Sequence, residues 1–501
     1  MLLAQIVEKI KTLEMLPKML PEILSLQNNK ETSQNIVHFI GIGGIGMSAL
    51  ALVLRQKNIA VQGSDLSKNY LSEKMENAKI DYFLGHDSIN INNKVTLVVK
   101  TSIIKDSNPE IIEAKNLNIP IITRAELLAA LMSEKIGITI AGTHGKTSTT
   151  AMISFIVEEA GLDPTFINGG ILNNFASNQK IGKGKYFIAE SDESDASFVN
   201  LPSKIGVITN IEPEHLDFIG YNGSFAIQKQ YYRQYLDQIP NDSICAICLD
   251  NKESQELAIN CSNQEKIIGY SLDSANKTAK ITASNIKIDS QGSSFSVNFI
   301  DGRKIANIFM GIYGKHNVSN ALAAIAIADY LSIDHQVIIK AFSKFLGVKR
   351  RFSKVGQYRG AVIIDDYGHH PTEIETTLVT AKSICSGKLI CVFEPHKFTR
   401  IRDLFNEFCH AFYSADIVLV SEIYSAGQSP IANISQETLV QGIMEAGNSK
   451  VLAFKNQDQL ARLIKEIVEK DDIIFCTGAG NITYWAEQLQ SQLENLDNAN
   501  K

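Results

Sequence analysis

The sequence has no run of about 18 apolar residues, the length that a helix needs to cross a membrane. Basic residues are not in excess either: 48 Lys and Arg stand against 54 Asp and Glu, a formal net charge of −6. No basic stripe marks a surface for nucleic acid. We therefore expect neither a membrane span nor a nucleic-acid partner.

Cysteine is scarce, with seven residues scattered over 501, and an odd number suits a reducing compartment better than a disulfide framework. Cys245 and Cys248 form the one C-x-x-C pair, but they lie in an apolar run typical of a strand, so we expect buried strand cysteines there. Residues 1–26 have no uninterrupted apolar core and do not form a secretory signal. These features predict a cytoplasmic protein.

The chain is too long for one hydrophobic core, and its length predicts about three domains. Its composition, 45% hydrophobic and 20% charged, is that of an ordinary globular protein. Motifs and junctions predict four segments: an N-terminal extension at 1–34, and domains at 35–132, 133–346 and 347–501.

The central domain opens with a candidate phosphate loop at 138–150. A β-branched run enters a turn of small residues, and the helix-compatible segment 151–160 follows. Such a turn points backbone amides at phosphate oxygens, and the helix adds the positive end of its dipole. Lys146 would supply charge for the outer phosphates and Thr147 would hold a magnesium ion. Ile140 stands where the usual loop has its first glycine, so the loop is a shortened form. The pattern predicts a site for ATP and Mg²⁺.

The first domain carries a second nucleotide motif. An apolar strand at 36–40 leads into Gly41-Ile-Gly-Gly-Ile-Gly46, a helix-like segment follows, and a second strand at 60–65 ends in Asp65. The glycines allow a tight turn, the helix start accepts a pyrophosphate, and the acid reaches a ribose hydroxyl. The motif predicts a diphosphate-bearing nucleotide, and NAD, FAD and a UDP-sugar all fit it.

Two further strands of the central domain end in acidic loops. The strand at 185–190 delivers Glu190, followed by three carboxylates, and the strand at 205–210 precedes Glu212-Pro-Glu-His215. Parallel strands bring their carboxyl ends to one edge, so these groups should lie near the phosphate loop, as in an ATPase. Taken alone, the first loop also fits an acidic surface, and His215 is more typical of a structural histidine.

The last domain has four predicted strands, each ending in a polar or glycine-rich loop, at 361–364, 389–393, 417–420 and 472–475. This arrangement predicts a second doubly wound domain. The predicted fold class is therefore α/β with three domains: a Rossmann-like N-terminal domain, a central P-loop ATPase-type domain and a Rossmann-like C-terminal domain.

Together these loops resemble those of the Mur ligases, the ATP-dependent enzymes that build the peptide stem of bacterial peptidoglycan. The shortened loop Gly142-Thr-His-Gly-Lys-Thr147, the Glu190 and His215 motifs and Asp365-Asp-Tyr-Gly-His-His-Pro371 carry the resemblance, which extends over residues 37–485. It implies that ATP phosphorylates the lactyl carboxylate of UDP-N-acetylmuramate, and that the amine of L-alanine then attacks the acyl phosphate.

The resemblance also implies roles for individual residues. The catalytic group would be Lys146, Glu190 and His215. Thr147 and Glu190 would hold one magnesium ion, and His215 would belong to a second metal site near the lactyl carboxylate, with Glu193 as a neighbour. The UDP-sugar site would comprise Gly41, Gly43, Gly44, Gly46, Asp65 and Ser102. The ATP site would comprise Gly142, Thr143, His144, Gly145, Lys146, Thr147, Ser148, Asn317, Asn320, Arg351 and Asp366. The amino-acid site would comprise His396, Lys397 and Arg400.

Lys397 departs from the pattern, since the family usually has arginine there, and lysine cannot make the same bidentate contact with a carboxylate. Three other readings stay open: a related ligase that adds a preformed peptide, an NAD-dependent dehydrogenase, and an ATP-driven binding module. The dehydrogenase would leave the phosphate loop and the last domain unused. We expect a monomer or a homodimer.

Overall fold

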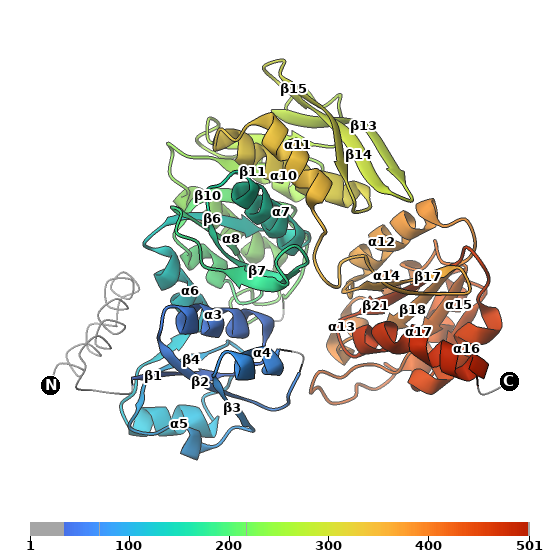
Figure 1. Ribbon diagram of the computed structural model, residues 1–501, viewed down its shortest axis with the longest axis horizontal. Coiled ribbons are helices and arrows are strands. Elements are labelled where there is room, and N and C mark those ends of the chain that lie inside the picture. The colour runs from blue at the N-terminus through green and yellow to red at the C-terminus, as the bar shows by residue number, and fades with distance from the viewer. Residues whose placement is uncertain (1–34, 70, 217, 499–501) are drawn as a thin grey trace. The chain divides into compact units, whose positions relative to one another are not determined.

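The computed structural model describes residues 35–498 apart from Tyr70 and Asp217 (Figure 1). The extension expected at 1–34 lies outside the described residues. The chain divides into two compact units. The first runs to residue 282 and includes 298–303 and 320–341, and the second holds 283–297, 304–319 and 342–501.

The first unit begins with a five-stranded parallel sheet, ordered β3-β2-β1-β4-β5. Its strands are β1 (Ile36–Ile40), β2 (Ala60–Asp65), β3 (Asp81–Leu84), β4 (Val95–Lys100) and β5 (Ile121–Thr123). Its helices are α3 (Ile45–Gln56), α4 (Ser72–Asn77), η2 (Ser88–Asn90), α5 (Pro109–Asn116) and α6 (Arg124–Met132). This is the Rossmann-like order that the sequence predicts.

Local sequence fixes where two of these helices begin. Asn108 caps α5 by accepting a hydrogen bond from the amide of Glu110, and Pro109 occupies the first helical position, where a missing N–H costs nothing. Thr123 and Glu126 form a reciprocal capping box at the start of α6. The chain therefore turns from strand to helix at defined residues.

The first unit continues with a second sheet, in which the order β12-β11-β10-β6-β9-β7-β8 places the phosphate-loop strand centrally. Its strands are β6 (Ile136–Ala141), β7 (Thr165–Leu172), β8 (Ser177–Lys180), β9 (Tyr186–Glu190), β10 (Ser203–Ile208), β11 (Cys245–Cys248) and β12 (Ile267–Ser271). Its helices are α7 (Lys146–Glu159), η3 (Ser197–Asn200), α8 (Phe225–Gln238) and α9 (Lys252–Ile259).

The predicted apolar runs become buried strands. The pairs β6–β9 and β6–β10 are parallel, with Ile140 opposite Glu190 and Ala141 opposite Ile208. Cys245 and Cys248 lie buried in β11, and all seven cysteines are free, which confirms the expectation of strand cysteines.

The two sheets of the first unit share a core. Met47 and Leu50 of α3 belong to the same buried apolar cluster as Ile167 of β7 and Phe187 of β9. The Asn178 amide of β8 also donates to the carbonyl of Ile45, at 2.9 Å. The helix after the first glycine turn therefore packs directly on the domain that holds the phosphate loop.

Residues 281–344 contribute to both units in turn. They form β13 (Ile281–Asp289), β14 (Gly292–Phe299), β15 (Lys304–Met310), α10 (Lys315–Tyr330) and α11 (His335–Lys344). In the first unit, Ile281 and Thr282 pair in parallel with Tyr270 and Ser271 at the end of β12.

The second unit contains a six-stranded sheet ordered β16-β17-β21-β18-β19-β20, parallel except for β16. Its strands are β16 (Ser353–Tyr358), β17 (Ala361–Asp366), β18 (Leu389–Glu394), β19 (Ile417–Val420), β20 (Val451–Ala453) and β21 (Ile473–Gly478). Its helices are α12 (Pro371–Ile384), α13 (Phe398–Asp403), α14 (Phe405–His410), α15 (Gln436–Glu445), α16 (Gln457–Ile467) and α17 (Ile482–Asn498).

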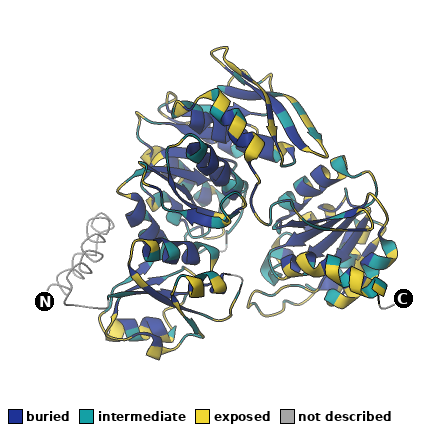
Figure 2. Ribbon diagram, viewed as in Figure 1, coloured by how far each residue is buried: buried dark blue, intermediate teal, exposed yellow. Residues whose placement is uncertain are grey.

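Helices cover both faces of this sheet. One apolar cluster joins Leu378 of α12 to Phe393 of β18, and another joins Leu489 of α17 to Val392, the residue before Phe393. The central strands are buried along their length, whereas the outer faces of α16 and α17 are exposed (Figure 2). Burial on both faces explains the continuous apolar runs. The predicted α/β fold class, with a Rossmann-like N-terminal domain, a P-loop domain in the middle of the sequence and a Rossmann-like C-terminal domain, is confirmed.

Over residues 35–498, within the limits of what the structure describes, none of the helices combines the length and the apolar character that a membrane span requires.

Candidate active site

The phosphate loop connects β6 to α7 through two glycines that steric crowding requires. Gly142 has φ +130°, and a Cβ there would lie 2.0 Å from the Thr209 hydroxyl oxygen. Gly145 has φ +83°, and a Cβ there would lie 2.5 Å from Oδ1 of Asn320, in the part of α10 that belongs to the first unit. A larger residue at Gly142 would push the loop away from the end of β10, and one at Gly145 would push it away from Asn320, so the two glycines allow the loop to pack closely on both.

Lys146 is the first residue of α7, and its ammonium lies inside the loop. Its Nζ donates to the carbonyls of Gly142 at 2.6 Å and Thr143 at 2.9 Å, and it forms an ion pair with Glu193 at 2.7 Å. Burial lowers the pKa of Lys146. The carboxylates of Glu193 and Glu190 raise it by a larger amount, so the net pKa lies above its ordinary value. The ammonium therefore stays charged, as binding of phosphate oxygens requires.

The loop is also tied to the neighbouring strand end. The Thr143 hydroxyl accepts a hydrogen bond from the amide of Glu212 at 2.8 Å, and the His144 amide donates to Asn210 at 2.8 Å. The imidazole of His144 lies 3.4 Å from the Glu212 carboxylate. Ser148, half-buried, is on the first turn of α7. These contacts fix the loop against the segment after β10.

Thr147 and Glu190 form a hydroxyl–carboxylate pair at the edge of the sheet. The Thr147 hydroxyl lies 3.0 and 3.1 Å from the two Glu190 oxygens. The Gly169 amide donates to the same carboxylate at 2.7 Å, which holds it in place. Oxygen donors of this kind are the ligands that Mg²⁺ takes in phosphoryl-transfer sites, so the pair fits the predicted metal.

A second candidate cation site lies beside Lys146. Ligand atoms of Glu193, Glu214 and His215 all lie within 4.8 Å of one another. His215 has φ +56°, in the left-handed region that residues with a side chain rarely adopt. The structure thus brings His215 and Glu193 together as predicted. It adds Glu214, which sequence reasoning missed although it stands next to His215 in the same motif.

Buried side chains support this cluster from behind. The Tyr221 hydroxyl donates to the main-chain carbonyl of Glu193 at 2.5 Å, and the Gln228 amide donates to that of Glu214 at 2.8 Å. Burial raises the pKa of the Glu193 carboxyl, and Lys146 opposes the shift. The cluster is thus held by groups on α8 and the loop before it.

The glycine turn of the first domain is anchored to the end of β2. Gly41, at φ +85°, and Ile42 both donate their amides to the Ser64 carbonyl, at 2.8 and 3.0 Å. The Gly43 amide donates to the Asp65 carboxylate at 2.8 Å. Gly44 caps α3. The turn after β4 carries the exposed Ser102. Because β1, β2 and β4 are adjacent and parallel, the predicted UDP-sugar residues of these loops share one edge of the sheet.

Arg124 connects this turn to the acidic loop. A Cβ on Gly46 would lie 3.3 Å from Cδ of Arg124, and the Arg124 guanidinium lies 3.3 Å from the Asp192 carboxylate. Sequence reasoning assigned no function to Arg124. Its place at the start of a capped helix gave no motif from which to find it.

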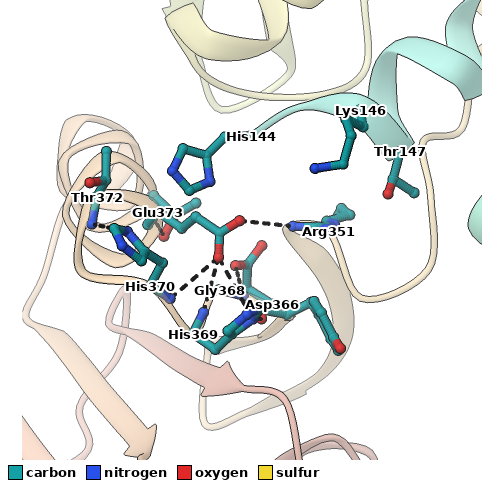
Figure 3. A network of polar contacts seen from close by, with 12 residues as sticks. His144, Lys146, Thr147, Arg351, Asp366, Gly368, His369, His370, Thr372 and Glu373 are labelled. Carbon is teal, nitrogen blue, oxygen red and sulfur yellow. Dashed lines mark hydrogen bonds and ion pairs between the residues drawn. The ribbon is translucent and has the colours of Figure 1, made fainter. Parts of the chain in front are cut away.

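In the second unit, Arg351 and Asp366 belong to one polar network centred on Glu373 (Figure 3). The Glu373 carboxylate lies 3.8 Å from the Arg351 guanidinium. It also accepts hydrogen bonds from the main-chain amides of His369, at 3.2 Å, and His370, at 3.4 Å. Asp366 accepts the amides of Phe352 and Gly368, both at 2.8 Å.

Asn317 also belongs to the second unit, where it donates to the Tyr313 carbonyl at 2.7 Å. Of the four predicted ATP-site residues outside the phosphate loop, Asn320 lies beside that loop in the first unit. The other three, Asn317, Arg351 and Asp366, lie in the second unit.

The predicted amino-acid residues lie together between the end of β18 and the first turn of α13. The His396 ring stacks on Tyr424 with centroids 5.4 Å apart, and Nη1 of Arg400 lies 3.3 Å from Nδ1 of His396. Burial, together with the charges of His369, Arg400 and Lys397, lowers the pKa of His396 to about 3. His396 is therefore neutral at physiological pH, and Lys397 and Arg400 carry the positive charge of this patch.

Sequence models of three protein domains match consecutive parts of the chain. These are the catalytic domain of the Mur ligase family over residues 36–136, the Mur ligase middle domain over 140–328, and the Mur ligase glutamate ligase domain over 350–480.

Two relatives are similar over almost their whole length. The chain is 40% identical to UDP-N-acetylmuramate–L-alanine ligase of Rhodospirillum centenum over 465 residues, which cover 92% of this chain and 95% of that protein. It is 41% identical to the protein of the same name from Agrobacterium fabrum over 467 residues, with coverages of 92% and 97%.

Solved structures agree in fold. UDP-N-acetylmuramate-alanine ligase from Thermotoga maritima superposes with a TM-score of 0.78 at 26% identity and covers 93% of this chain and 99% of its own. A murein peptide ligase from Psychrobacter arcticus superposes with a TM-score of 0.68 at 24% identity, with coverages of 92% and 99%, and shares the fold.

The Tyr221 hydroxyl leads to a first prediction. Tyr221→Phe removes the hydrogen bond to the Glu193 main chain and should weaken binding of Mn²⁺, used as a paramagnetic probe, about 10-fold, because the carboxylate loses its support. Titration followed by electron paramagnetic resonance measures this. Tyr231→Phe, which keeps the ring packed on Tyr221, is the matched control and should bind like the parent. Equal affinity in both variants would contradict a supporting role for the Tyr221 hydroxyl.

A second prediction concerns pH and the buried Asp365 in the second unit. Burial raises the pKa of its carboxyl from 3.8 to about 7, with Arg350 opposing the shift and Asp366 adding to it. The folded protein thus keeps a proton that the unfolded chain releases. Asp365 contributes stability that is fully present below its unfolded pKa and is lost as the pH rises through about 7.

Asp365→Asn cannot titrate and lacks this loss. As the pH rises from 4 to 7, the free energy of unfolding of the parent should therefore fall by about 2–4 kcal/mol more than that of the variant. Urea unfolding followed by the fluorescence of Trp485, the single tryptophan of the chain, reports on this unit. Asp458→Asn, at an exposed position of α16, should leave the pH dependence unchanged. A parallel pH profile for Asp365→Asn and the parent would refute the assignment.

Proposed function

The chain belongs to the Mur ligase family, and from this premise we propose that it is an ATP-dependent ligase that joins L-alanine to the lactyl carboxylate of UDP-N-acetylmuramate. The observation that carries the proposal is an identity of about 40% over 92% of the chain to ligases of that name. The products are ADP, phosphate and UDP-N-acetylmuramoyl-L-alanine, a precursor of peptidoglycan.

The chemistry explains why ATP is consumed. A carboxylate is a poor acyl donor at neutral pH, so one lactyl oxygen first attacks the γ-phosphorus of ATP, and ADP leaves. The amine of L-alanine then attacks the acyl carbon, the tetrahedral intermediate collapses and inorganic phosphate leaves with the transferred oxygen. Most of the work that falls to the protein is to position three substrates and to neutralise phosphate charge.

Lys146 has the geometry for the transferred phosphoryl group. Its charged ammonium lies within the phosphate loop and 2.7 Å from Glu193, at the sheet edge where the acidic loop begins after β9. The amides at the start of α7 would bind the other phosphate oxygens. The remaining ATP contacts are proposed for loop residues 142–145 and 147–148, and for Asn317, Asn320, Arg351 and Asp366.

The two acidic groups fit divalent cations. Thr147 and Glu190 would hold one magnesium ion, and Glu193, Glu214 and His215 would hold a second. When bound, magnesium neutralises charge on the phosphates. Within this chain, Glu190 and Glu193 would orient the ions relative to Lys146.

The first domain is proposed to hold the UDP part of the sugar substrate. The turn of Gly41, Gly43, Gly44 and Gly46 at the start of α3 suits a pyrophosphate, and Asp65 and Ser102 are at the adjacent strand ends. Since α3 packs on β7 and β9 within the first unit, the turn has a fixed position relative to the phosphate loop.

His396, Lys397 and Arg400 are proposed to bind L-alanine. Because Arg400 can only donate to Nδ1 of His396, the neutral imidazole carries its proton on Nε2, where it would donate to the substrate carboxylate that Lys397 and Arg400 attract. Lys397 offers a point charge in place of a planar fork, so Arg400 would provide the directional contact.

We further propose that the enzyme acts in the cytoplasm, where ATP and nucleotide-linked sugars are available, and that it is a monomer or a homodimer. Light scattering in solution tests the second point.

A substrate panel tests the proposed function. Phosphate release from ATP with UDP-N-acetylmuramate should require L-alanine, with glycine and L-serine as smaller and more polar competitors and a preformed tripeptide as the alternative substrate. The product should be identified by mass spectrometry. Activity with the tripeptide alone would reject the proposal in favour of a peptide-adding ligase. Turnover independent of any amino acid would instead indicate an ATP-driven binding module.

Lys146→Ala should reduce kcat at least ~100-fold, because a charge-assisted contact to the phosphoryl group is lost in the transition state. Single-turnover phosphate release measures the chemical step. Lys183→Ala, an exposed lysine of the same domain, is the control and should retain full activity. Near-parental turnover by a folded Lys146→Ala variant would remove Lys146 from the mechanism.

A further inference from the structure

A buried polar network lies in the first domain and takes no part in the chemistry described above. Its centre is the Glu110 carboxylate, which is fully buried on the first turn of α5. Around it lie polar groups from β1, β2, η2 and the loop after β3. Neither the glycine motif nor the phosphate loop includes any of them.

Four side chains contact this carboxylate. The Ser64 hydroxyl donates to Oε2 at 2.6 Å and the Asn90 amide donates to Oε1 at 2.7 Å. The His38 ring nitrogen Nε2 lies 3.4 Å from Oε1, and the His86 Nδ1 lies 3.1 Å from Oε2. Each carboxylate oxygen therefore accepts one hydrogen bond from a hydroxyl or amide group and has a histidine nitrogen within 3.4 Å.

These contacts keep Glu110 ionised. Burial alone would raise its pKa, but the hydrogen bonds from His38, Ser64 and Asn90 outweigh it, and the net pKa is lowered. The N-terminal end of α5 also favours negative charge at this position. A buried carboxylate of this kind adds little stability compared with an apolar core residue, and such groups are best attested as devices that fix one arrangement of the chain.

The arrangement that Glu110 fixes includes the glycine turn. Ser64 donates its hydroxyl to Glu110, while its carbonyl accepts the amides of Gly41 and Ile42. The next residue, Asp65, accepts the amide of Gly43. Three consecutive amides of the turn are thus held by two residues at the end of β2, and one of these two is bonded to Glu110.

We propose that Glu110 is a positioning residue for the UDP-sugar: through Ser64 it sets the strand end that holds the amides of the pyrophosphate-binding turn. This inference rests on the proposed function, because it assumes that the turn binds UDP-N-acetylmuramate. Glu110 itself does not contact the substrate, and the conformation of the phosphate loop does not depend on it.

Isothermal titration with UDP-N-acetylmuramate tests the inference on the full chain. Glu110→Gln keeps the shape of the side chain but replaces an acceptor oxygen with a donor NH₂, so the dissociation constant should rise about 10-fold. The affinity for a non-hydrolysable ATP analogue, and kcat at saturating sugar, should stay at the parental values. Glu113→Gln, on the same helix and outside the network, is the matched control.

Ser64→Ala gives a second, independent route to the same result. Both substitutions act on the same hydrogen bond, that between the Ser64 hydroxyl and the Glu110 carboxylate. The double variant Ser64→Ala/Glu110→Gln should therefore bind the sugar no more than about 2-fold more weakly than Glu110→Gln alone. Additive losses would show that the two residues act separately and would overturn the inference.

The outcomes separate the inference from the function on which it rests. If the parental protein does not bind UDP-N-acetylmuramate, the proposed function fails. If the parent binds and Glu110→Gln binds equally well, only the positioning role fails. Equal losses of sugar affinity, ATP-analogue affinity and kcat would show a general effect on folding and would also overturn it.

Discussion

The ion pair between Lys146 and Glu193 is the interaction on which the central site depends. It joins the first residue of α7 to the acidic loop after β9, so an ion pair of 2.7 Å connects the phosphate loop to the candidate cation cluster. Burial makes each charge costly alone, and each is tolerated because the other is present. The elements around the pair serve to hold it: two glycines close the loop, Tyr221 holds the main chain of Glu193, and β6, β9 and β10 converge on one edge.

Much of this could be predicted from the sequence, since the signals were local. The glycine turn, the phosphate loop and the acidic strand ends are each coded within a dozen residues, and parallel pairing brings the ends of β6, β9 and β10 together as expected. Arg124, Tyr221 and Glu110 could not be found in this way. Arg124 contacts Asp192, 68 residues away, Tyr221 contacts Glu193, 28 residues away, and Glu110 contacts Ser64, 46 residues away. A short sequence motif cannot predict contacts over such separations.

The two nucleotide turns are supported by different physical means. The phosphate loop is fixed by steric crowding, because Gly142 and Gly145 leave no space for a Cβ. The turn after β1 is fixed by hydrogen bonds, with its amides held by Ser64 and Asp65 and the strand end held in turn by a buried carboxylate. A sterically fixed loop tolerates few substitutions within itself, whereas a hydrogen-bonded turn can be disturbed by residues that never touch it.

His215 has a left-handed backbone conformation, and Lys397 has a similar φ of +70°. A positive φ costs free energy in a residue that has a side chain. Glycine would adopt either conformation without strain and would stabilise the folded chain by relieving it. It would also remove a candidate cation ligand at His215 and a positive charge from the proposed amino-acid site at Lys397. The strain at these two positions is therefore the cost of a side chain in that place, and glycine would exchange what that side chain does for stability.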